Sequence, residues 1–472
     1  MGSKVGAAEK VRMKSLKSRI LKMVKPTADE LKSATYHANE IIARLKAVAP
    51  KNVEIVTAGS VARGTQVRGS YDIDVFLLFP KGEDERSMEM RGVALAKKIV
   101  DKSKKESFII KYAEHPYVKI LLEGGSISAD IVPAFKIKNA LDLGSAVDRT
   151  PLHNEFVNAH LSAKQKDDVR IFKALLKNHN VYGAEAQVRG FSGYLCELLI
   201  FYYGSFESLI GAFSRIKIPA IINIGNKTEV DPKSEQGTAL LKRFESDFLV
   251  IDPTDVNRNV AASVSKQSIA KLVLVSKALA RKPVIEVFNG VQYSSTLAKE
   301  KLLDFQKAMD FDIYLLAFSY DDIAEDIIWE QLTKLRLRIN DLLSRNGFAP
   351  LQSFQNIRGG LCIAAFFINR IYNGCSIRRG PSVFMGDATE AFLKAHRESL
   401  GLFLQDDRVI SLEKSEYADP EMLLLNLKSG RDFTIPSHIR PASRFVYMNK
   451  KIPEEHARLL YEAFEDAMIT VF

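Results

Sequence analysis

The sequence predicts a multidomain α/β protein with a mixed-sheet head, a helical central domain and an α+β C-terminal region. At 472 residues the chain is too long for a single hydrophobic core. Strand-like and helix-like apolar patterns alternate in residues 28–147, helical spacing prevails in residues 148–282, and both patterns return in residues 283–472. A basic extension, residues 1–27, precedes these three regions.

The head is predicted to begin with a helix and to contain one sheet. Apolar residues at helical spacing predict a helix over residues 28–49. Further along, Gly124-Gly125-Ser126 predicts a hairpin turn, because glycine accepts positive φ. The other predicted elements are strands over Val53–Ala58, Ile73–Phe79, Phe108–Tyr112, Tyr117–Leu122 and Ile127–Val132, and a helix over Met90–Lys102.

Apolar residues at a period of about 3.6 predict the helices of the central domain. These helices are Val169–Leu176, Gly193–Phe213 and Val264–Ala280. After Pro283 the predicted elements are strands over Val284–Phe288, Asp312–Ser319 and Cys362–Ile368, and helices over Thr296–Ala308 and Ile328–Leu343. Such an α+β sandwich resembles RNA-recognition modules. After Gly380, helices and short strands mix without an order that we can define.

The composition is that of a soluble globular protein, with 46% hydrophobic and 26% charged residues. No apolar stretch is long enough for a membrane span, and the N-terminus lacks the apolar core of a signal peptide. Three scattered cysteines form no CxxC pair, which argues against a disulfide framework and a structural zinc site. We therefore expect a cytoplasmic protein with no membrane partner.

The net charge of +10 is concentrated at the N-terminus. Residues 1–25 hold eight basic residues against the single acid Glu9, a net charge of +7. A basic arm of this kind can bind nucleic-acid phosphates by counterion release. A solvated tail explains the same composition equally well, and a mitochondrial transit peptide is a minor alternative.

Three aspartates are candidates for a metal site. Asp72 and Asp74 are two residues apart, so in a strand their carboxylates project from the same face. Asp130 lies in a second apolar strand, and if the two strands pair, all three carboxylates converge. Clustered anions repel each other unless divalent cations intervene, and an all-oxygen site suits Mg²⁺. Such a site can catalyse phosphoryl displacement.

The turn before these aspartates is a candidate phosphate cradle. Gly59 lets the backbone approach a phosphate closely, and the N–H groups of a following helix would point at the anion. Ser60 adds a hydroxyl group and Arg63 a permanent positive charge. The cradle and the metal site are joined by one short connection.

The order Gly59-Ser60, Asp72-x-Asp74 and Asp130 resembles the signature of the DNA polymerase β nucleotidyltransferase superfamily. Four further stretches are similar, more narrowly, to archaeal, class I CCA-adding enzymes. They are Tyr112-Ala113-Glu114-His115-Pro116-Tyr117-Val118, Ser145-Ala146-Val147-Asp148-Arg149-Thr150-Pro151, Val188-Arg189-Gly190-Phe191-Ser192-Gly193-Tyr194-Leu195-Cys196-Glu197-Leu198-Leu199, and Asp252-Pro253 with Arg258-Asn259-Val260-Ala261. Beyond Pro283 the similarity is thin apart from Arg378-Arg379-Gly380-Pro381.

The resemblance implies roles for particular residues. Asp72, Asp74 and Asp130 match the metal-binding carboxylates, although the first is Glu in some members. Ser60 and Arg63 match a triphosphate-binding pair, while Val61 stands where an aromatic residue is common. The residues matching the surroundings of the incoming nucleotide are Thr150, His153, Lys173 and Tyr182, and Arg258 matches a residue that helps to recognise the base.

Without the resemblance, most of these side chains would be interpreted as structural. His153 would be an ordinary surface histidine, Lys173 would lie on the solvated face of a helix, and Tyr182 would be a half-buried anchor. Arg258 differs, because an arginine in a turn-like Asp-Pro segment already suggests anion binding.

The resemblance implies template-independent addition of CCA to the 3′ end of tRNA from CTP and ATP, with Mg²⁺ as cofactor. A homodimer is among the assemblies we expect. The first alternative is another template-free RNA-tailing enzyme, a poly(A) or poly(U) polymerase, which shares the carboxylates. The second is a non-catalytic RNA-binding protein, although such a protein would be expected to lose at least one of the three aspartates.

Overall fold

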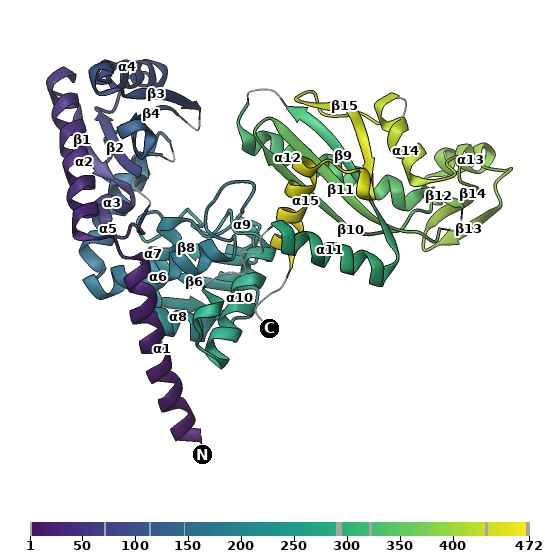
Figure 1. Cartoon of the computed structure of the whole chain (residues 1–472), viewed down its shortest axis with the longest axis horizontal. Coiled ribbons are helices and arrows are strands. Elements are labelled where there is room, and N and C mark those ends of the chain that lie inside the picture. Colours follow the sequence, from purple (N-terminus) through teal and green to yellow (C-terminus); the bar gives the residue numbers. More distant parts are fainter. Residues whose placement is uncertain are drawn as a thin grey trace. The chain divides into compact units, whose positions relative to one another are not determined.

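In the computed structural model the chain folds into two compact units, Met1–Val291 and Gln292–Met468 (Figure 1). The structure describes residues 2–69, 72–112, 115–145, 147–288, 295–320, 323–372, 374–429 and 433–468. Ala113, Glu114 and Ala146, which belong to the motifs above, lie outside the described residues, as do Ser70 and Tyr71 just before Asp72.

The head contains one five-stranded mixed sheet, as predicted. Its strand order is β1 (Glu54–Ala58), β2 (Asp72–Phe79), β5 (Ile127–Phe135), β4 (Pro116–Leu122) and β3 (Ser107–Tyr112). Strands β2 and β5 run parallel, and the other neighbours are antiparallel. The parallel pair requires a crossover, which is made through α4 (Glu85–Lys98) and the strands β3 and β4.

Two helices, α2 (Ala28–Val48) and α4, cover one face of this sheet. Alternate residues of β2, including Ile73 and Val75, point into the core beneath these helices. Because side chains alternate along a strand, Asp72 and Asp74 point to the opposite face. The apolar pattern of β2 therefore decides on which side the aspartates emerge.

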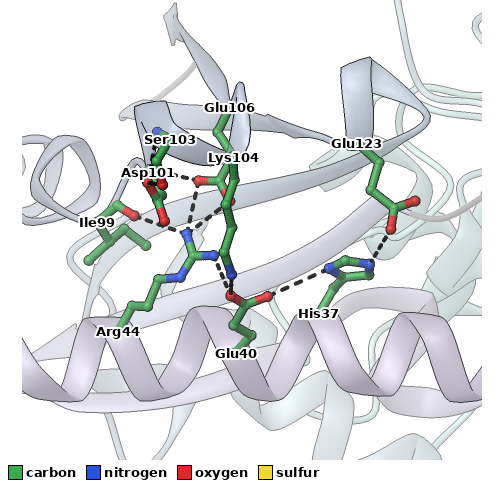
Figure 2. Close-up of polar contacts among 9 residues, drawn as sticks. All are labelled: His37, Glu40, Arg44, Ile99, Asp101, Ser103, Lys104, Glu106 and Glu123. Carbon is green, nitrogen blue, oxygen red and sulfur yellow. Dashed lines mark hydrogen bonds and ion pairs between the residues drawn. The ribbon is translucent and has the colours of Figure 1, made fainter.

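A polar network on the helix-covered side ties α2 to the far part of the head (Figure 2). Arg44 Nη1 donates to both carboxylate oxygens of Glu106, at 3.0 and 2.9 Å, and Arg44 Nη2 donates to Glu40 at 2.5 Å. One helical turn earlier, His37 Nε2 lies 3.1 Å from Glu123 Oε1, at the turn between β4 and β5. These contacts fix the helix layer against both β3 and the hairpin.

The central domain packs its helices around one core, and two predictions for it need correction. The helix predicted over Gly193–Phe213 is two helices, α7 (Gly193–Tyr203) and α8 (Phe206–Phe213), because Gly204 adopts a left-handed conformation with φ of 82°. No single helix among the described residues is long and apolar enough to cross a membrane; α7 and α8 reach that combination only as a pair bent by 94°. The strand predicted over Val284–Phe288 is wrong, since a short 3₁₀ helix, η5 (Ile285–Val287), lies there.

The other central helices are α5 (Thr150–His160), α6 (Ala163–Asn178) and α10 (Lys266–Arg281), together with α9 (Glu235–Phe244). The helical pattern of the sequence concealed a three-stranded sheet of very short strands. Its order is β7 (Thr228–Val230), β6 (Ala220–Asn223) and β8 (Phe248–Ile251). Strands of three or four residues are too short to show a period of two.

The basic extension forms a helix, α1 (Gly2–Val24), that lies against the central helices (Figure 1). Met13, Leu16 and Ile20 are buried in the central core. Lys17 forms ion pairs with Asp168, at 2.6 Å, and with Glu207, at 2.7 Å. The interpretation as a solvated tail is therefore wrong for this segment, whose helical apolar stripe was hidden by its many lysines. The side chains of residues 2–10, including Lys4, Glu9 and Lys10, lie outside the described ones.

The second unit is built on a four-stranded antiparallel sheet and confirms the α+β prediction. The strand order is β10 (Pro350–Arg358), β11 (Leu361–Asn369), β9 (Phe311–Tyr320) and β15 (Ile439–Met448). Helices α12 (Glu325–Arg345) and α14 (Pro420–Asn426) cover one face, while α11 (Ser295–Met309) and α15 (Glu454–Ala467) cover the other. RNA-recognition modules stack bases on an open sheet face, whereas apolar helices cover both faces here.

A small subdomain explains why the sequence after Gly380 could not be ordered. Strands β12 (Cys375–Ser382), β14 (Arg408–Lys414) and β13 (Gly401–Gln405) form a three-stranded sheet, with α13 (Gly386–Ala395) against β12. Strand β13 is exposed along most of its length, and β12 and β14 bury only two and three residues, so burial does not impose a regular period of two on their sequences.

Candidate active site

The parallel pairing of β2 and β5 brings the three aspartates together. In its register Asp74 lies opposite Asp130, and Asp72 lies opposite Ser128. All three carboxylates emerge on the sheet face that α2 and α4 leave free. Asp72 is at the open end, with 60% of its side chain exposed, whereas 16% of the Asp130 side chain is exposed.

Burial and mutual repulsion change the acidity of these carboxylates. Burial and the charge of Asp130 raise the pKa of Asp74 to about 6. Burial also raises the pKa of Asp130, with partial compensation from Lys119. Asp72 behaves differently: burial would raise its pKa, but a hydrogen bond from Ser128 and the charge of Lys119 lower it below the usual value. The three carboxylates therefore carry more negative charge than the surrounding side chains stabilise.

Lys119 is a member of this site that the sequence did not reveal. It projects from β4, where it lies opposite Asp130, and its Nζ is 3.2 Å from both Asp72 Oδ1 and Asp130 Oδ1. Asp130 Oδ1 is buried, and among the described residues it has this ion pair but no well-directed hydrogen bond. A lysine within the apolar strand predicted over Tyr117–Leu122 was the feature that could have identified it.

Gly59 opens α3 (Gly59–Arg63) directly beside the carboxylates. Its φ is 70°, and a Cβ atom built there would lie 1.6 Å from Asp74 Oδ2. Only glycine combines this left-handed conformation with such close approach. Ser60 follows in the same short helix and is partly exposed next to the site.

Arg63, by contrast, is buried and is held by two protein side chains. Its Nη1 donates to Asn154 Oδ1 at 2.9 Å, and its Nε lies 2.8 Å from Glu197 Oε2. Asn154 in turn donates from Nδ2 to the carbonyl of Thr57, at 2.9 Å. Neither Asn154 nor Glu197 was singled out from the sequence. The signal for Glu197 was a lone charge inside the apolar segment that forms α7.

Lys173 is buried, so the expectation of a solvated lysine is wrong. Its Nζ donates to the carbonyl and to the hydroxyl of Thr65, both at 3.2 Å, and lies 3.6 Å from Glu197 Oε1. Tyr182 reaches the same place: a Cβ atom at Gly193 would lie 3.1 Å from the Tyr182 hydroxyl and 3.6 Å from Lys173 Nζ. The two side chains therefore converge at the start of α7.

His153 and Arg258 form a second group around a buried aspartate. Arg258 Nη1 lies 2.9 Å from Asp252 Oδ2 and 3.2 Å from His153 Nε2. His153 stacks on Tyr194, with ring centroids 3.9 Å apart, and is buried rather than at the surface as its residue type alone suggested. Burial lowers the pKa of His153, although Asp252 opposes this. A neutral imidazole is therefore expected near pH 7.

The three aspartates and the group around His153 both interact electrostatically with Arg63. The charge of Arg63 lowers both the pKa of Asp74 and that of His153. Thr150 begins α5, one turn before His153, and is partly buried. The structure thus gathers the predicted residues on one side of the head sheet and on the adjoining central helices.

A separate acidic group lies on α4. Glu85 and Glu89 stand one turn apart, and His115 Nδ1 is 2.7 Å from Glu89 Oε1 and 3.6 Å from Glu85 Oε1. These contacts give the buried His115 ring two partners on α4.

Comparisons with known proteins identify relatives of each part of the chain. Three family models match successive parts of the chain: a nucleotidyltransferase domain over residues 38–153, the second domain of tRNA nucleotidyltransferase over 167–289, and the C-terminal domain of the CCA-adding enzyme over 311–443. The CCA-adding enzyme of Methanocaldococcus jannaschii is 32% identical over 429 residues, which cover 89% of this chain and 92% of the relative. That of Archaeoglobus fulgidus is 31% identical over 416 residues, 87% of this chain and 88% of the relative.

Among solved structures, the poly(U) polymerase Cid1 with Mg 3′-dATP bound is similar to 59% of this chain and 98% of its own, with 14% identity and a TM-score of 0.46. The sequence matches extend over nearly the full length of their relatives and include the region of the three aspartates. The chain belongs to the family of CCA-adding enzymes.

Proposed function

We propose that Asp72, Asp74 and Asp130 form the catalytic centre of this CCA-adding enzyme and hold divalent metal, with Mg²⁺ as the ion used. The chain is a tRNA nucleotidyltransferase, which adds CCA to the 3′ end of tRNA from CTP and ATP. The observation that carries the proposal is the parallel register of Asp74 with Asp130, with Asp72 two residues away on the same face.

The residues present fit a hard divalent cation. All three ligands would be carboxylate oxygens, which Mg²⁺ prefers. The raised pKa of Asp74 and the poorly satisfied Asp130 Oδ1 mark an excess of negative charge that Lys119 only partly relieves. When bound, the metal supplies a lower pKa for the RNA 3′-hydroxyl and neutralises charge on the triphosphate.

The protein side chains then perform the orientation and the proton transfer. The incoming 3′-hydroxyl would attack the α-phosphate, with pyrophosphate as the leaving group. Asp130 is also the proposed acceptor of the hydroxyl proton, since a carboxylate beside the attacking hydroxyl can act as a general base. Gly59 permits close approach to the carboxylates, and Ser60 is the proposed hydroxyl donor to the triphosphate.

We assign the triphosphate to Arg63, Lys173 and Tyr182, and the nucleoside to Thr150, His153 and Arg258. Support for the first assignment is the convergence of Tyr182 and Lys173 beside Gly193, close to the buried Arg63. The second is supported by the Asp252 carboxylate, which holds one Nη of Arg258 and leaves the side chain 32% exposed. A fixed, partly exposed guanidinium is suited to the hydrogen-bonding edge of a base.

We further propose that tRNA phosphates contact the basic face of α1 and that the second unit contacts tRNA elsewhere. Arg12, Lys14, Arg19 and Lys22 are exposed, opposite the buried stripe of this helix. The second unit is assigned by its match to the C-terminal domain of the CCA-adding enzyme. A cytoplasmic location is in keeping with the buried free thiols of Cys196 and Cys362. A homodimer stays a prediction, which light scattering of the purified protein would test.

The deciding experiment is extension of a tRNA that lacks its CCA end, with all four nucleotides and Mg²⁺. We expect two cytidines and one adenosine to be added, and then arrest. A long homopolymeric tail would instead identify a poly(A) or poly(U) polymerase. Absence of metal-dependent extension, with tRNA binding intact, would identify a non-catalytic RNA-binding protein.

A further inference from the structure

Glu197 is the one charged residue of α7, and it is completely buried. The rest of this helix is apolar or aromatic apart from Gly193. A buried carboxylate is costly unless cations or hydrogen bonds compensate for its lost hydration. Burial alone would raise the pKa of Glu197, but the charges of Arg63 and Lys173 lower it below the usual value, so the group is ionised.

Three residues from three places meet at this carboxylate. Arg63, from α3 in the head, lies 2.8 Å from Oε2 through its Nε. Lys173, from α6 in the central domain, lies 3.6 Å from Oε1. Thr65, which follows α3, donates a short hydrogen bond from its hydroxyl to Oε1. Glu197 therefore joins the cradle of the head to the helices of the central domain.

The group is not electrically balanced. Arg63 and Lys173 are two basic groups against the single carboxylate of Glu197, so when Lys173 is protonated one positive charge has no counter-charge within this group. The nearby Asp74 has a raised pKa, and Arg63 only partly lowers it. A buried site with an excess of fixed positive charge is suited to an anion, and a triphosphate has the required charge.

We propose that Glu197 is a positioning residue for the incoming nucleotide, whose carboxylate holds Arg63 and Lys173 in place and keeps both charged for the triphosphate. This inference rests on the proposed function, in which these two cations bind CTP and ATP. Glu197 itself would not touch the nucleotide, because it is enclosed by the core and by the two cations.

The charge of Lys173 makes the proposal testable. Burial lowers the pKa of Lys173, and Glu197 is the largest opposing influence. The other titratable groups that face Lys173 are Cys196 on α7, Arg63 on α3, Lys177 one turn along α6 and the Tyr182 hydroxyl. In Glu197→Gln the counter-charge is lost, so Lys173 should release its proton at a lower pH than in the wild-type protein.

The experiment compares the wild-type protein with Glu197→Gln from about pH 6.5 to about pH 9. Calorimetry gives the Kd for CTP, and extension assays give KM and kcat for CTP. We expect the Kd ratio of variant to wild type to grow about tenfold across this range as Lys173 loses its charge first in the variant, the usual worth of a charged hydrogen bond. KM should rise more than kcat falls. Comparing each variant with wild type at the same pH cancels the titration of the nucleotide. In a Lys173→Met background the ratio should become independent of pH, because no lysine titrates.

The matched control is Asp168→Asn. Asp168 is also a buried acid of the central domain, paired with Lys17 at 2.6 Å, and it lies outside the proposed site. The Asp168→Asn substitution should lower the thermal midpoint without a pH-dependent change in the Kd for CTP. A Glu197→Gln protein with wild-type Kd at every pH, or with the same pH-independent effect as the control, would overturn the proposal.

Two further variants keep the test decisive. If Glu197→Gln does not fold, Glu197→Asp shortens the reach of the carboxylate but keeps its charge; a raised Kd supports positioning, and an unchanged Kd at every pH overturns it. Arg63→Ala and Lys173→Met test the proposed function itself. If neither raises Kd, the triphosphate assignment fails; if both do and Glu197→Gln does not, only the role of Glu197 fails.

Discussion

Gly59 and Asp74 are in such close contact that a Cβ atom at Gly59 would lie 1.6 Å from Asp74 Oδ2. The proposed phosphate cradle and the strand proposed to bind metal are therefore not independent parts of the site. Any side chain at position 59 must displace the carboxylate that pairs with Asp130 across the parallel strands.

Gly59→Ala is expected to reduce kcat by at least about a hundredfold, because a misplacement of the order of 1 Å in a catalytic group costs this much. Steady-state extension assays with circular dichroism of the same preparation would measure it. The control is Gly82→Ala, at a positive φ of 100° but with no atom within 4 Å of the added methyl group. That variant should lose some stability and keep its activity. An equal loss of activity in both variants would mean that backbone strain, rather than contact with Asp74, explains the effect at Gly59.

Asp72→Asn, Asp74→Asn and Asp130→Asn are each expected to lower the rate by several orders of magnitude, because each removes a negative charge from the metal site. Affinity for tRNA should change little, since the proposed phosphate contacts lie on other residues. Single-turnover extension and equilibrium binding would separate the two effects. Near-normal turnover of any one variant would remove that residue from the assignment.

Asp74→Asn should also stabilise the metal-free protein at neutral and higher pH. A carboxyl group whose pKa is raised to about 6 in the folded state destabilises that state when ionised. The gain from Asn should be fully present above about pH 6, reach at most about 3 kcal/mol, and vanish below about pH 4, as the group becomes protonated in both states. Thermal melts in EDTA as a function of pH would measure this. In Mg²⁺ the sign should reverse, because the variant loses a ligand.

Arg258→Ala should relax the choice of base and leave bond formation possible. The loss of a good bidentate contact costs about 1–3 kcal/mol of discrimination. Arg258→Lys should restore little, because an ammonium group lacks the planar fork. Sequencing of tails made from mixed nucleotides would reveal uridine or guanosine. A slow variant that still adds CCA faithfully would make Arg258 a phosphate-binding or structural residue.

The same assay can test how Arg258 is oriented. Asp252 is fully buried and holds Arg258 Nη1 at 2.9 Å. The Asp252→Asn variant is therefore expected to incorporate uridine or guanosine, as the Arg258→Ala variant does, but less often.

Neutralising the basic face of α1 should weaken tRNA binding and reduce its salt dependence. The variant Arg12→Ala/Lys14→Ala/Arg19→Ala/Lys22→Ala removes four exposed charges and leaves the buried stripe intact. Each lost phosphate contact lowers the slope of log affinity against log salt by about one. Deleting residues 1–25 is the poorer test, because it removes Met13, Leu16 and Ile20 from the core. If the quadruple variant keeps the wild-type slope of log affinity against log salt, these four charges do not contact tRNA phosphates.

Much of the head and part of the site follow from residues that are near one another in the chain. The mixed sheet, the hairpin at Gly124 and the shared face of Asp72 and Asp74 all come from the period of two and from glycine conformation, which are local properties. The family resemblance also rests on contiguous stretches. The spacing of apolar residues did not predict two parts of the fold. In α1 the many lysines obscured the apolar stripe, and the strands β6 to β8 are too short to show a period.

Contacts between distant segments could not be obtained this way. Lys119, Asn154, Glu197 and Asp252 reach the site from four separate elements, and burial reversed the interpretation of Lys173 and His153. Their charges and hydrogen bonds depend on which segments pack together across the core. This packing is set by the complementarity of many apolar side chains that are far apart in the sequence. The charge states of Asp74 and Glu197 are therefore defined only when the head packs against the central helices.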